Sequence, residues 1–145
     1  MKQILLFGAG MSASSLIKYL LEQCDKFDWQ LKVIDRDLEL INSKLKGHAK
    51  SEAIVIDITD DSSRRTEIKK ADIVISMLPA FLHVLVAEDC LDIKKNLVTA
   101  SYVSQELKDM TADVEAAGLC FMNEIGLDPG IDHMSAMKVI HSVKD

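Results

Sequence analysis

The sequence has no stretch long enough to cross a membrane and no secretory leader at its start. Its longest run without a charged residue spans 73–87, and this run contains Ser76, Pro79 and His83. A membrane helix needs roughly 20 apolar residues. Lys2 leads directly into a short apolar run, whereas a signal peptide has a longer apolar core. We therefore expect no membrane segment and no export signal, and we expect a cytoplasmic protein.

The sequence is also poor in basic charge, aromatic residues and paired cysteines. It has 17 Lys and Arg against 23 Asp and Glu, a net charge of −6, which argues against nucleic acid as the main partner. An aromatic fraction of 5% suits an aliphatic parallel sheet. Cys24, Cys90 and Cys120 lie far apart and form no Cys-x-x-Cys pair. This pattern is typical of free thiols in a reducing compartment.

Several catalytic and metal-binding motifs are missing as well. No group of His, Cys and carboxylate residues has the spacing of metal ligands, so we expect no bound metal. Neither a Gly-x-Ser-x-Gly elbow nor a Walker phosphate loop occurs.

The sequence does contain a glycine turn near its start, written Gly8-x-Gly10-x-x-Ala13, directly after a short apolar run. Gly8 permits a tight turn, and Gly10 lets the backbone approach a pyrophosphate closely. Ala13 allows the following helix to pack on the strand. The helix start, with Met11 and Ser12, would direct free N–H groups at the phosphates. The order of strand, turn and helix predicts a dinucleotide-binding unit.

Strand and helix signals alternate along the whole chain, which is typical of a parallel α/β sheet. The predicted strands are 3–7, 31–35, 53–57, 72–77, 96–100 and 119–123. The predicted helices are 11–24, 38–46, 60–70, 79–91, 104–117 and 131–143. Six strands in this order fit a Rossmann-type doubly wound sheet with strand order 3-2-1-4-5-6, in one domain of 145 residues.

Two positions at strand ends bear on the choice of dinucleotide. Asp35 ends the second predicted strand, where a carboxylate accepts hydrogen bonds from the adenosine ribose and repels a 2′-phosphate, so it favours NAD over NADP. Arg36 follows directly, and an arginine at this place can stack on adenine or reach a 2′-phosphate. Asp57 ends the third predicted strand, where it would either contact the adenine edge or serve as a turn residue.

Polar residues at three further strand ends predict the edge of an active site, because ligands of open α/β sheets lie outside the carboxyl ends of the strands. The polar side chains are those of Ser76, Ser101, Tyr102 and Asp128. Met77 follows the fourth strand beside Ser76, and Pro129 and Gly130 follow the sixth beside Asp128. We expect His83 to be a packed residue more than a substrate contact, and His133 to face the site near Asp128. His48 and His141 are expected at the surface.

The segment 123–134, Asn-Glu-Ile-Gly-Leu-Asp-Pro-Gly-Ile-Asp-His-Met, closely resembles the signature of the saccharopine reductase family. These are the glutamate-forming saccharopine dehydrogenases of lysine metabolism. The glycine turn, the stretch Ile75-Ser-Met-Leu-Pro79 with His83 four residues on, and Thr99-Ala-Ser-Tyr-Val-Ser104 agree with the same family. The resemblance covers essentially the whole chain.

The resemblance implies an oxidoreductase that oxidises the secondary amine of saccharopine with NAD(P)⁺, after which water splits the imine into glutamate and 2-aminoadipate 6-semialdehyde. It assigns substrate contacts to Ser101 and Tyr102. It places Leu127, Asp128 and Pro129 around the nicotinamide, and Gly10 to Ala13 and Asp35 at the rest of the coenzyme. Tyr102 or Asp128 would serve as a proton shuttle if burial shifts its pKa.

Family members continue into a second domain with most substrate and dimer contacts. We therefore expect 1–145 to be the N-terminal coenzyme domain of a longer, homodimeric two-domain enzyme, which binds dinucleotide without turnover when alone. Two alternatives stay open. One is a related opine or carboxynorspermidine-type imine reductase, and the other is a non-catalytic NAD-sensing module, which would not need Ser101, Tyr102 and the 128–130 edge.

Overall fold

The computed structural model describes residues 1–144, and it confirms the predicted α/β fold. One six-stranded parallel sheet has the order β3-β2-β1-β4-β5-β6, as the sequence predicted. The strands are β1 (Lys2–Phe7), β2 (Trp29–Asp35), β3 (Ser51–Val55), β4 (Ile73–Ser76), β5 (Asn96–Thr99) and β6 (Phe121–Met122). The order reverses between β1 and β4, so the carboxyl ends of these two strands form the switch point at which such sheets bind ligands.

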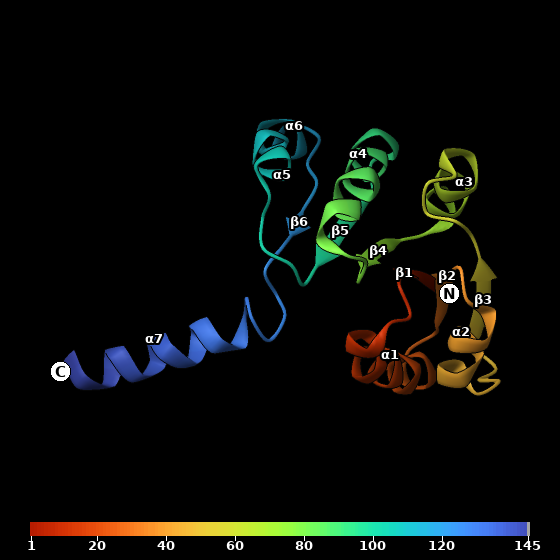
Figure 1. Ribbon diagram of the computed structural model, residues 1–145, viewed down its shortest axis with the longest axis horizontal. Coiled ribbons are helices and arrows are strands. Elements are labelled where there is room, and N and C mark those ends of the chain that lie inside the picture. The colour runs from red at the N-terminus through yellow and green to blue at the C-terminus, as the bar shows by residue number, and fades with distance from the viewer. Residues whose placement is uncertain (145) are drawn as a thin grey trace.

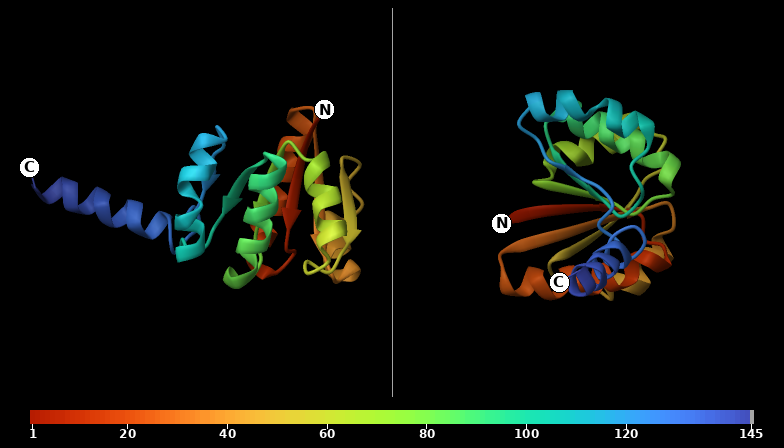
Figure 2. Two further views of the ribbon diagram at one scale, coloured as in Figure 1. Left: turned by 90° about the horizontal axis from the view of Figure 1, so that it is seen from above. Right: turned by 90° about the vertical axis from the view of Figure 1, so that its left-hand side faces the viewer.

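Helices cover both faces of the sheet (Figure 1). On one face lie α1 (Ser14–Lys26), preceded by the 3₁₀ turn η1 (Met11–Ala13), and α2 (Leu38–Leu45). The opposite face carries α3 (Asp61–Lys70), the 3₁₀ turn η2 (Ala80–Leu82) with α4 (His83–Ile93), α5 (Gln105–Asp109) and α6 (Thr111–Ala116). The sheet, seen end-on in Figure 2, lies between the two helix layers.

The core has two parts, one on each face of the sheet, because successive residues of a strand point to opposite faces. Ile4 and Leu6 of β1 face α1 and α2, where they pack with Val33 of β2. Leu5 and Phe7 face α3 and α4. The strands β1 and β2 therefore have apolar residues on both sides, as expected of a parallel sheet covered by helices.

The structure corrects three predicted boundaries. β3 ends at Val55, two residues before Asp57, because its neighbour β2 ends at Asp35, which pairs with Val55. The predicted helix 104–117 is two helices, α5 and α6, separated at Met110, whose ψ of −11° departs from regular helix geometry. β6 is only two residues long, because it pairs with β5 alone and only at two positions.

The last helix, α7 (Ile131–Lys144), extends away from the sheet and its helix layers (Figures 1 and 2). Every residue of this helix is exposed. Among residues 1–144, no helix combines the length and apolarity that would let it span a bilayer.

Candidate functional site

The glycine turn after β1 has the geometry expected of a phosphate-binding turn. Gly8 has a φ of +95°, and a Cβ on it would lie 2.8 Å from the carbonyl oxygen of Met77, so both backbone conformation and packing against β4 require glycine. A Cβ on Gly10 would meet no atom within 4 Å and would instead fill the open space beside the turn. Ala13 is fully buried against the core. These features fit a diphosphate beside Gly10.

The start of η1 is open toward the same space. Its N-cap residue is Gly10, which has no side chain that could cap the N–H groups of the turn. Met11 is 93% exposed, and Ser12 is exposed as well. The first N–H groups of a helix have no partner within the helix, so these groups are free to bind an anion.

Asp35 holds the glycine turn against the end of β2. Its Oδ2 accepts a hydrogen bond of 2.8 Å from the N–H of Ala9, and its Oδ1 accepts one of 3.2 Å from the N–H of Asp37. Each carboxylate oxygen is therefore already bound by the backbone. The sequence-based prediction treated Asp35 as a ribose ligand only and did not foresee this contact.

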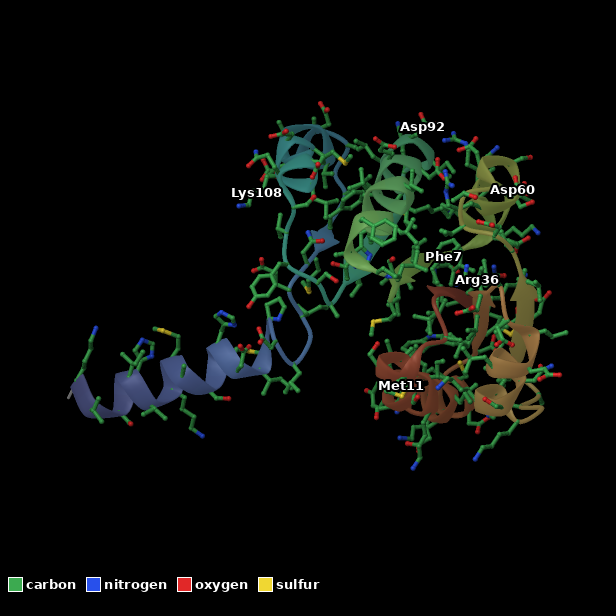
Figure 3. The ribbon with its side chains drawn as sticks, in the orientation of Figure 1. Phe7, Met11, Arg36, Asp60, Asp92 and Lys108 are labelled. Atoms are coloured by element: carbon green, nitrogen blue, oxygen red, sulfur yellow. The ribbon has the colours of Figure 1, made fainter. Side chains whose placement is uncertain are left out.

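A cleft of about 310 Å³ opens at the carboxyl ends of β1 and β2, next to the glycine turn. Phe7 and Arg36, which border it, are labelled in Figure 3 together with Met11 of η1. Its lining is mainly apolar: Phe7, Ile34, Asp35, Arg36, Ile56, Ile58, Leu78, Pro79, Phe81 and Leu82. An apolar cleft beside a phosphate-binding turn is suited to an adenine ring.

The sequence analysis found Asp35 and Arg36 in this cleft but missed most of its lining. Ile56 and Ile58 line it, whereas Asp57 between them does not. The Asp57 carboxylate accepts hydrogen bonds from the N–H and hydroxyl of Thr59, at 2.9 and 2.7 Å, and these bonds lower its pKa. Apolar residues at every second position from Ile54 to Ile58 were the signal that could have revealed this wall.

Ser76, at the end of β4, is joined to Ser101, after β5, through one histidine. The two ring nitrogens of His83 lie 2.8 Å from the Ser76 Oγ (Nδ1) and 2.8 Å from the Ser101 Oγ (Nε2). Ser76 is fully buried and His83 is 1% exposed, whereas Ser101 is half-buried. Burial lowers the pKa of His83, so the ring is neutral. His83 is the packed residue that the sequence predicted.

Tyr102 and Asp128 meet at the edge of the sheet. The Tyr102 hydroxyl donates a 2.6 Å hydrogen bond to the Asp128 Oδ1. This bond raises the pKa of Tyr102 to about 12. The hydrogen bond is the largest cause of this shift, and burial, the cause expected from the sequence, contributes less. At neutral pH, Tyr102 is therefore protonated and acts as a hydrogen-bond donor.

The loop 124–130 holds Asp128 in place through close backbone contacts. The Glu124 carboxylate accepts a 3.0 Å hydrogen bond from the N–H of Val103. The N–H of Gly126 bonds to the carbonyl of Pro129 at 2.9 Å, and a Cβ on Gly130, whose φ is +145°, would lie 2.1 Å from the carbonyl oxygen of Gly126. Pro129 is buried and Leu127 is 73% exposed, so of these two only Leu127 is open to a ligand.

Asp132 and His133 lie next to this pair, as predicted for His133. The ligand atoms of Asp128, Asp132 and His133 are within 4.8 Å of one another, on exposed side chains. The pKa of His133 is raised by its 2.8 Å hydrogen bond to Asp132. Burial pushes the pKa of Asp132 up, but hydrogen bonds from His133 and the N–H of Gly130 outweigh it and lower the value.

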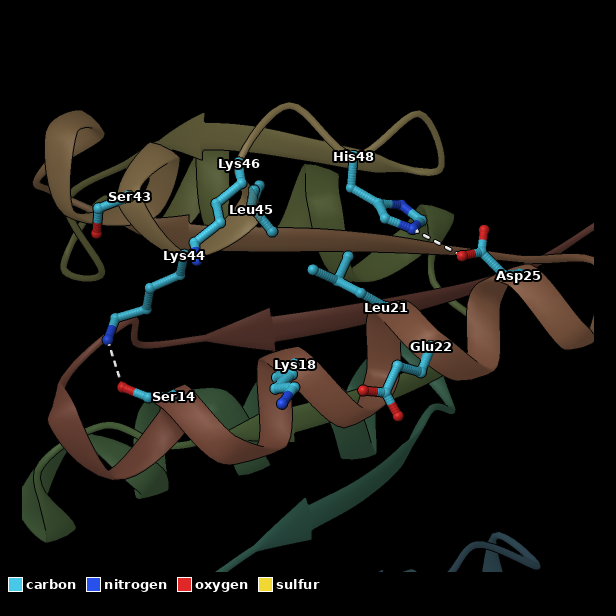
Figure 4. Close-up of a pocket in the computed structure, with 10 residues that line it drawn as sticks. All are labelled: Ser14, Lys18, Leu21, Glu22, Asp25, Ser43, Lys44, Leu45, Lys46 and His48. Carbon is cyan, nitrogen blue, oxygen red and sulfur yellow. Dashed lines mark hydrogen bonds and ion pairs between the residues drawn. The ribbon is translucent and has the colours of Figure 1, made fainter.

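A larger cleft, about 610 Å³, lies between α1 and α2 (Figure 4). Lys44 donates to the Ser14 hydroxyl across it at 2.5 Å, and His48 lies 3.2 Å from the Asp25 carboxylate. It contains none of the residues that the sequence singled out as binding or catalytic. His48 is half-buried here, whereas the sequence predicted a surface position; His141 is exposed as predicted.

Comparison with known proteins agrees with the family resemblance seen in the sequence. The family described as "Saccharopine dehydrogenase NADP binding domain" matches residues 4–122. Alpha-aminoadipic semialdehyde synthase from Arabidopsis thaliana is 39% identical over 81% of this chain and 11% of its own length. Saccharopine dehydrogenase [NADP(+), L-glutamate-forming] from Saccharomyces cerevisiae is 37% identical over 98% of this chain and 31% of its own length.

Solved structures agree with these sequence matches. Apo saccharopine dehydrogenase (L-Glu forming) from Saccharomyces cerevisiae superposes with a TM-score of 0.86 at 36% identity, covering 99% of this chain and 32% of that one. An NAD binding oxidoreductase from Klebsiella pneumoniae, with a TM-score of 0.61 at 16% identity over 84% of this chain and 34% of its own, shares the fold alone. The chain thus spans between about a tenth and a third of the length of these relatives.

Proposed function

The chain belongs to the saccharopine dehydrogenase family, in its NADP-binding domain, and from this we propose that it holds NADP for an enzyme that oxidises the C–N bond of saccharopine. The domains of this family bind a nicotinamide dinucleotide. The observation that carries the proposal is the glycine turn at the carboxyl end of β1, beside the apolar cleft of about 310 Å³ that Arg36 lines. The substrate and the reaction are carried over from relatives of greater length.

We propose NADP as the coenzyme, in place of the NAD that Asp35 favoured in the sequence analysis. The Asp35 oxygens accept backbone hydrogen bonds from Ala9 and Asp37, so this carboxylate has a role in the turn itself. Arg36 is exposed, lines the cleft and makes no ion pair with any residue in 1–144. Its guanidinium is free to bind a 2′-phosphate in a bidentate manner.

The polar residues at the other end of the edge have complementary roles in the proposed reaction. Bound NADP⁺ supplies the hydride acceptor. Ser101 and Tyr102 would contact the substrate, and Leu127 would border the nicotinamide. Asp128, with Tyr102 as its hydrogen-bond donor, would take up the proton that the amine or the attacking water releases. Met77 would border the nicotinamide ribose, since its carbonyl lies beside Gly8, whereas Ser76 is fully buried and would not reach the coenzyme.

We propose further that residues 1–145 form the N-terminal coenzyme domain of a longer, two-domain homodimer. Support comes from the length of the relatives and from α7. Apolar residues occur all around this helix and all are exposed: Ile131, Met134, Met137, Val139, Ile140 and Val143. A helix that is apolar on every side is normally surrounded by protein.

We also propose that the protein resides in a reducing compartment, which the sequence analysis expected to be the cytoplasm. Cys24 and Cys90 are buried and Cys120 is exposed, and all are free thiols. Several relatives carry the word mitochondrial in their names. Free thiols suit either reducing compartment.

Calorimetric titration of this chain with NADP⁺ and NAD⁺ tests the coenzyme assignment. We expect tighter binding of NADP⁺, and we expect Arg36→Gln to weaken NADP⁺ binding about 10- to 100-fold, the usual effect of losing a charge-assisted contact. The same substitution should change NAD⁺ binding less than about threefold, because NAD⁺ has no 2′-phosphate.

Lys108→Gln is the matched control, because Lys108 lies on α5, away from the cleft, and loses the same charge (Figure 3). It should leave both affinities unchanged. Equal loss of NADP⁺ and NAD⁺ affinity in Arg36→Gln would contradict the proposed phosphate contact. No binding of either dinucleotide by the parent chain would end the proposed function.

A further inference from the structure

We propose that His83 is a positioning residue, which fixes the Ser101 hydroxyl as a hydrogen-bond donor directed at the open edge of the site. The identity of the ligand, an amino-acid substrate with acceptor oxygens, rests on the proposed function. The geometry of the hydrogen bonds is independent of that function. Ser76, His83 and Ser101 form one connected chain of hydrogen bonds from the buried end of β4 to the exposed edge after β5.

The first step concerns the number of protons on the ring. His83 is almost completely buried, and its ring nitrogens bind two neutral hydroxyl groups and no carboxylate. An imidazolium there would have no counter-ion within hydrogen-bond distance, and burial lowers the pKa of the ring. The ring is therefore neutral, with one N–H donor and one acceptor nitrogen.

The second step decides which nitrogen carries the proton. Ser76 is fully buried, and within residues 1–144 its hydroxyl makes no hydrogen bond other than the one to the His83 Nδ1. If Nδ1 were protonated, the Ser76 hydroxyl would accept that bond and its own hydrogen would be buried without a partner, which is costly. If Nδ1 is the acceptor, every buried hydrogen is satisfied. The favoured tautomer therefore has its proton on Nε2.

The third step follows from the tautomer. The Nε2–H donates to the Ser101 Oγ, so Ser101 accepts from the ring and its own hydrogen is free for another acceptor. Ser101 is half-buried and precedes Tyr102, which binds Asp128. The free hydrogen is thus available to a carboxylate or carbonyl oxygen at the edge that the Tyr102–Asp128 pair also borders.

The same geometry argues against a proton relay through His83. A relay needs an exit at each end of the chain of hydrogen bonds. Ser76 is a closed end, because it is fully buried and bonded only to the ring. The ring therefore orients Ser101 without transferring protons.

The test is nuclear magnetic resonance of the ligand-free chain labelled with ¹⁵N-histidine, at about pH 7. Correlation of the ring carbon-bound hydrogens with both ring nitrogens distinguishes the two tautomers. The His83 signals are assigned by their loss in His83→Gln. We expect His83 in the Nε2–H form, while the exposed His141 gives the averaged pattern of a free ring.

Two variants separate positioning from simple packing. In Ser76→Ala the Nδ1 loses its donor, so the Nε2–H fraction should fall toward that of His141. In Ser101→Ala the Nδ1 keeps its donor, so the Nε2–H form should persist. A merely packed ring would respond equally to both substitutions.

An Nδ1–H ring in the parent chain would overturn the inference even if a variant failed to fold. So would a tautomer that changes in Ser101→Ala and persists in Ser76→Ala. Because these spectra are recorded without coenzyme, an Nε2–H ring in a chain that fails to bind NADP⁺ would refute the proposed function and leave the His83 assignment intact.

Discussion

At the scale of single residues, the site depends on contacts between groups far apart in the sequence. Tyr102 and Asp128 are 26 positions apart, and His83 and Ser101 are 18 positions apart. The sequence identified three of these residues as site candidates, because polar side chains followed predicted strands. It could not pair them, since the pairing depends on how the loops after β5 and β6 fold toward each other.

The Tyr102 hydroxyl should ionise at unusually high pH. The hydrogen bond to Asp128, with smaller effects of burial and of nearby carboxylates, raises its pKa from 10.0 to about 12, so at about pH 10 Tyr102 should stay almost entirely protonated. In Asp128→Asn the negative charge and its hydrogen bond are lost, so a larger fraction of Tyr102 should ionise at that pH. Ultraviolet absorbance of the tyrosinate measures this, with Tyr102→Phe as the control that isolates the chain's other tyrosine, Tyr19. Equal titration curves for the parent and Asp128→Asn would refute the contact.

His83 should make stability fall as the pH drops below the ordinary pKa of histidine, 6.5. Burial lowers its folded-state pKa below 6.5, so at lower pH the unfolded chain takes up a proton that the folded chain does not. The stability from this ring is complete above its ordinary pKa and is lost as pH falls toward the folded-state pKa. Urea unfolding should therefore show a smaller loss of free energy on acidification in His83→Gln than in the parent.

His141→Gln is the control for that comparison, because it makes the same replacement at an exposed histidine. His133 acts in the opposite sense, since Asp132 raises its pKa, and it is present in all three proteins. The carboxylates with lowered pKa, such as Asp72, act at lower pH, near their ordinary value of 3.8. A parent-like slope in His83→Gln would contradict the buried neutral ring.

At the scale of elements, α3 and α4 are joined by a buried ion pair that also supports the proposed coenzyme cleft. The Arg64 Nε lies 2.6 Å from the Asp89 carboxylate, with both side chains about 5% exposed, and Arg64 also donates a 2.6 Å bond to the carbonyl of Ile58. Arg65 binds Asp89 and Asp92 at the surface. Since Ile58 lines the cleft, Arg64 links the position of α4 to the wall of the cleft.

Loss of one partner of this pair should be more costly than loss of both. Arg64→Met leaves the Asp89 charge buried with only Arg65, and we expect it to lower the free energy of unfolding by about 3 kcal/mol. The double change Arg64→Met with Asp89→Leu should recover at least half of that loss. Urea unfolding measures the stability of both. A double variant less stable than Arg64→Met would contradict the prediction.

Calorimetry should also show weaker NADP⁺ binding in Arg64→Met, because the Ile58 carbonyl loses its donor.

The sequence predicted elements better than it predicted their ends. Strand order followed from the alternation of strands and helices, and the predicted helix 60–70 matches α3 to within one residue. The end of β3 was wrong because apolar alternation continues through Ile56 and Ile58 into the cleft wall, where it serves a ligand surface and not a strand pair. The periodicity of apolar residues predicts which residues are buried. It does not predict whether they pack against a neighbouring strand or line a ligand cleft.

At the scale of the whole molecule, one end of the chain is packed and the other is not. The sheet and its six associated helices bury a continuous core on both faces, whereas α7 contributes no buried residue. No residue of α7 lines the proposed coenzyme cleft, so the cleft does not depend on this helix. The exposed helix would then form the surface on which the rest of a longer protein packs.

Charges placed on α7 should therefore leave the fold and the coenzyme site unaffected. We expect Met137→Glu with Ile140→Lys to change the free energy of unfolding by less than about 0.5 kcal/mol and to leave NADP⁺ affinity within about twofold, because both residues are exposed. The parent chain should self-associate at high concentration through this apolar helix, and the variant should sediment as a monomer. Leu20→Lys on α1 is the contrasting control: Leu20 is 7% exposed, so a charge there should cost several kcal/mol. A comparable loss of stability from the α7 changes would mean that the helix packs on this domain in solution, and the surface for a second domain would have to be sought elsewhere.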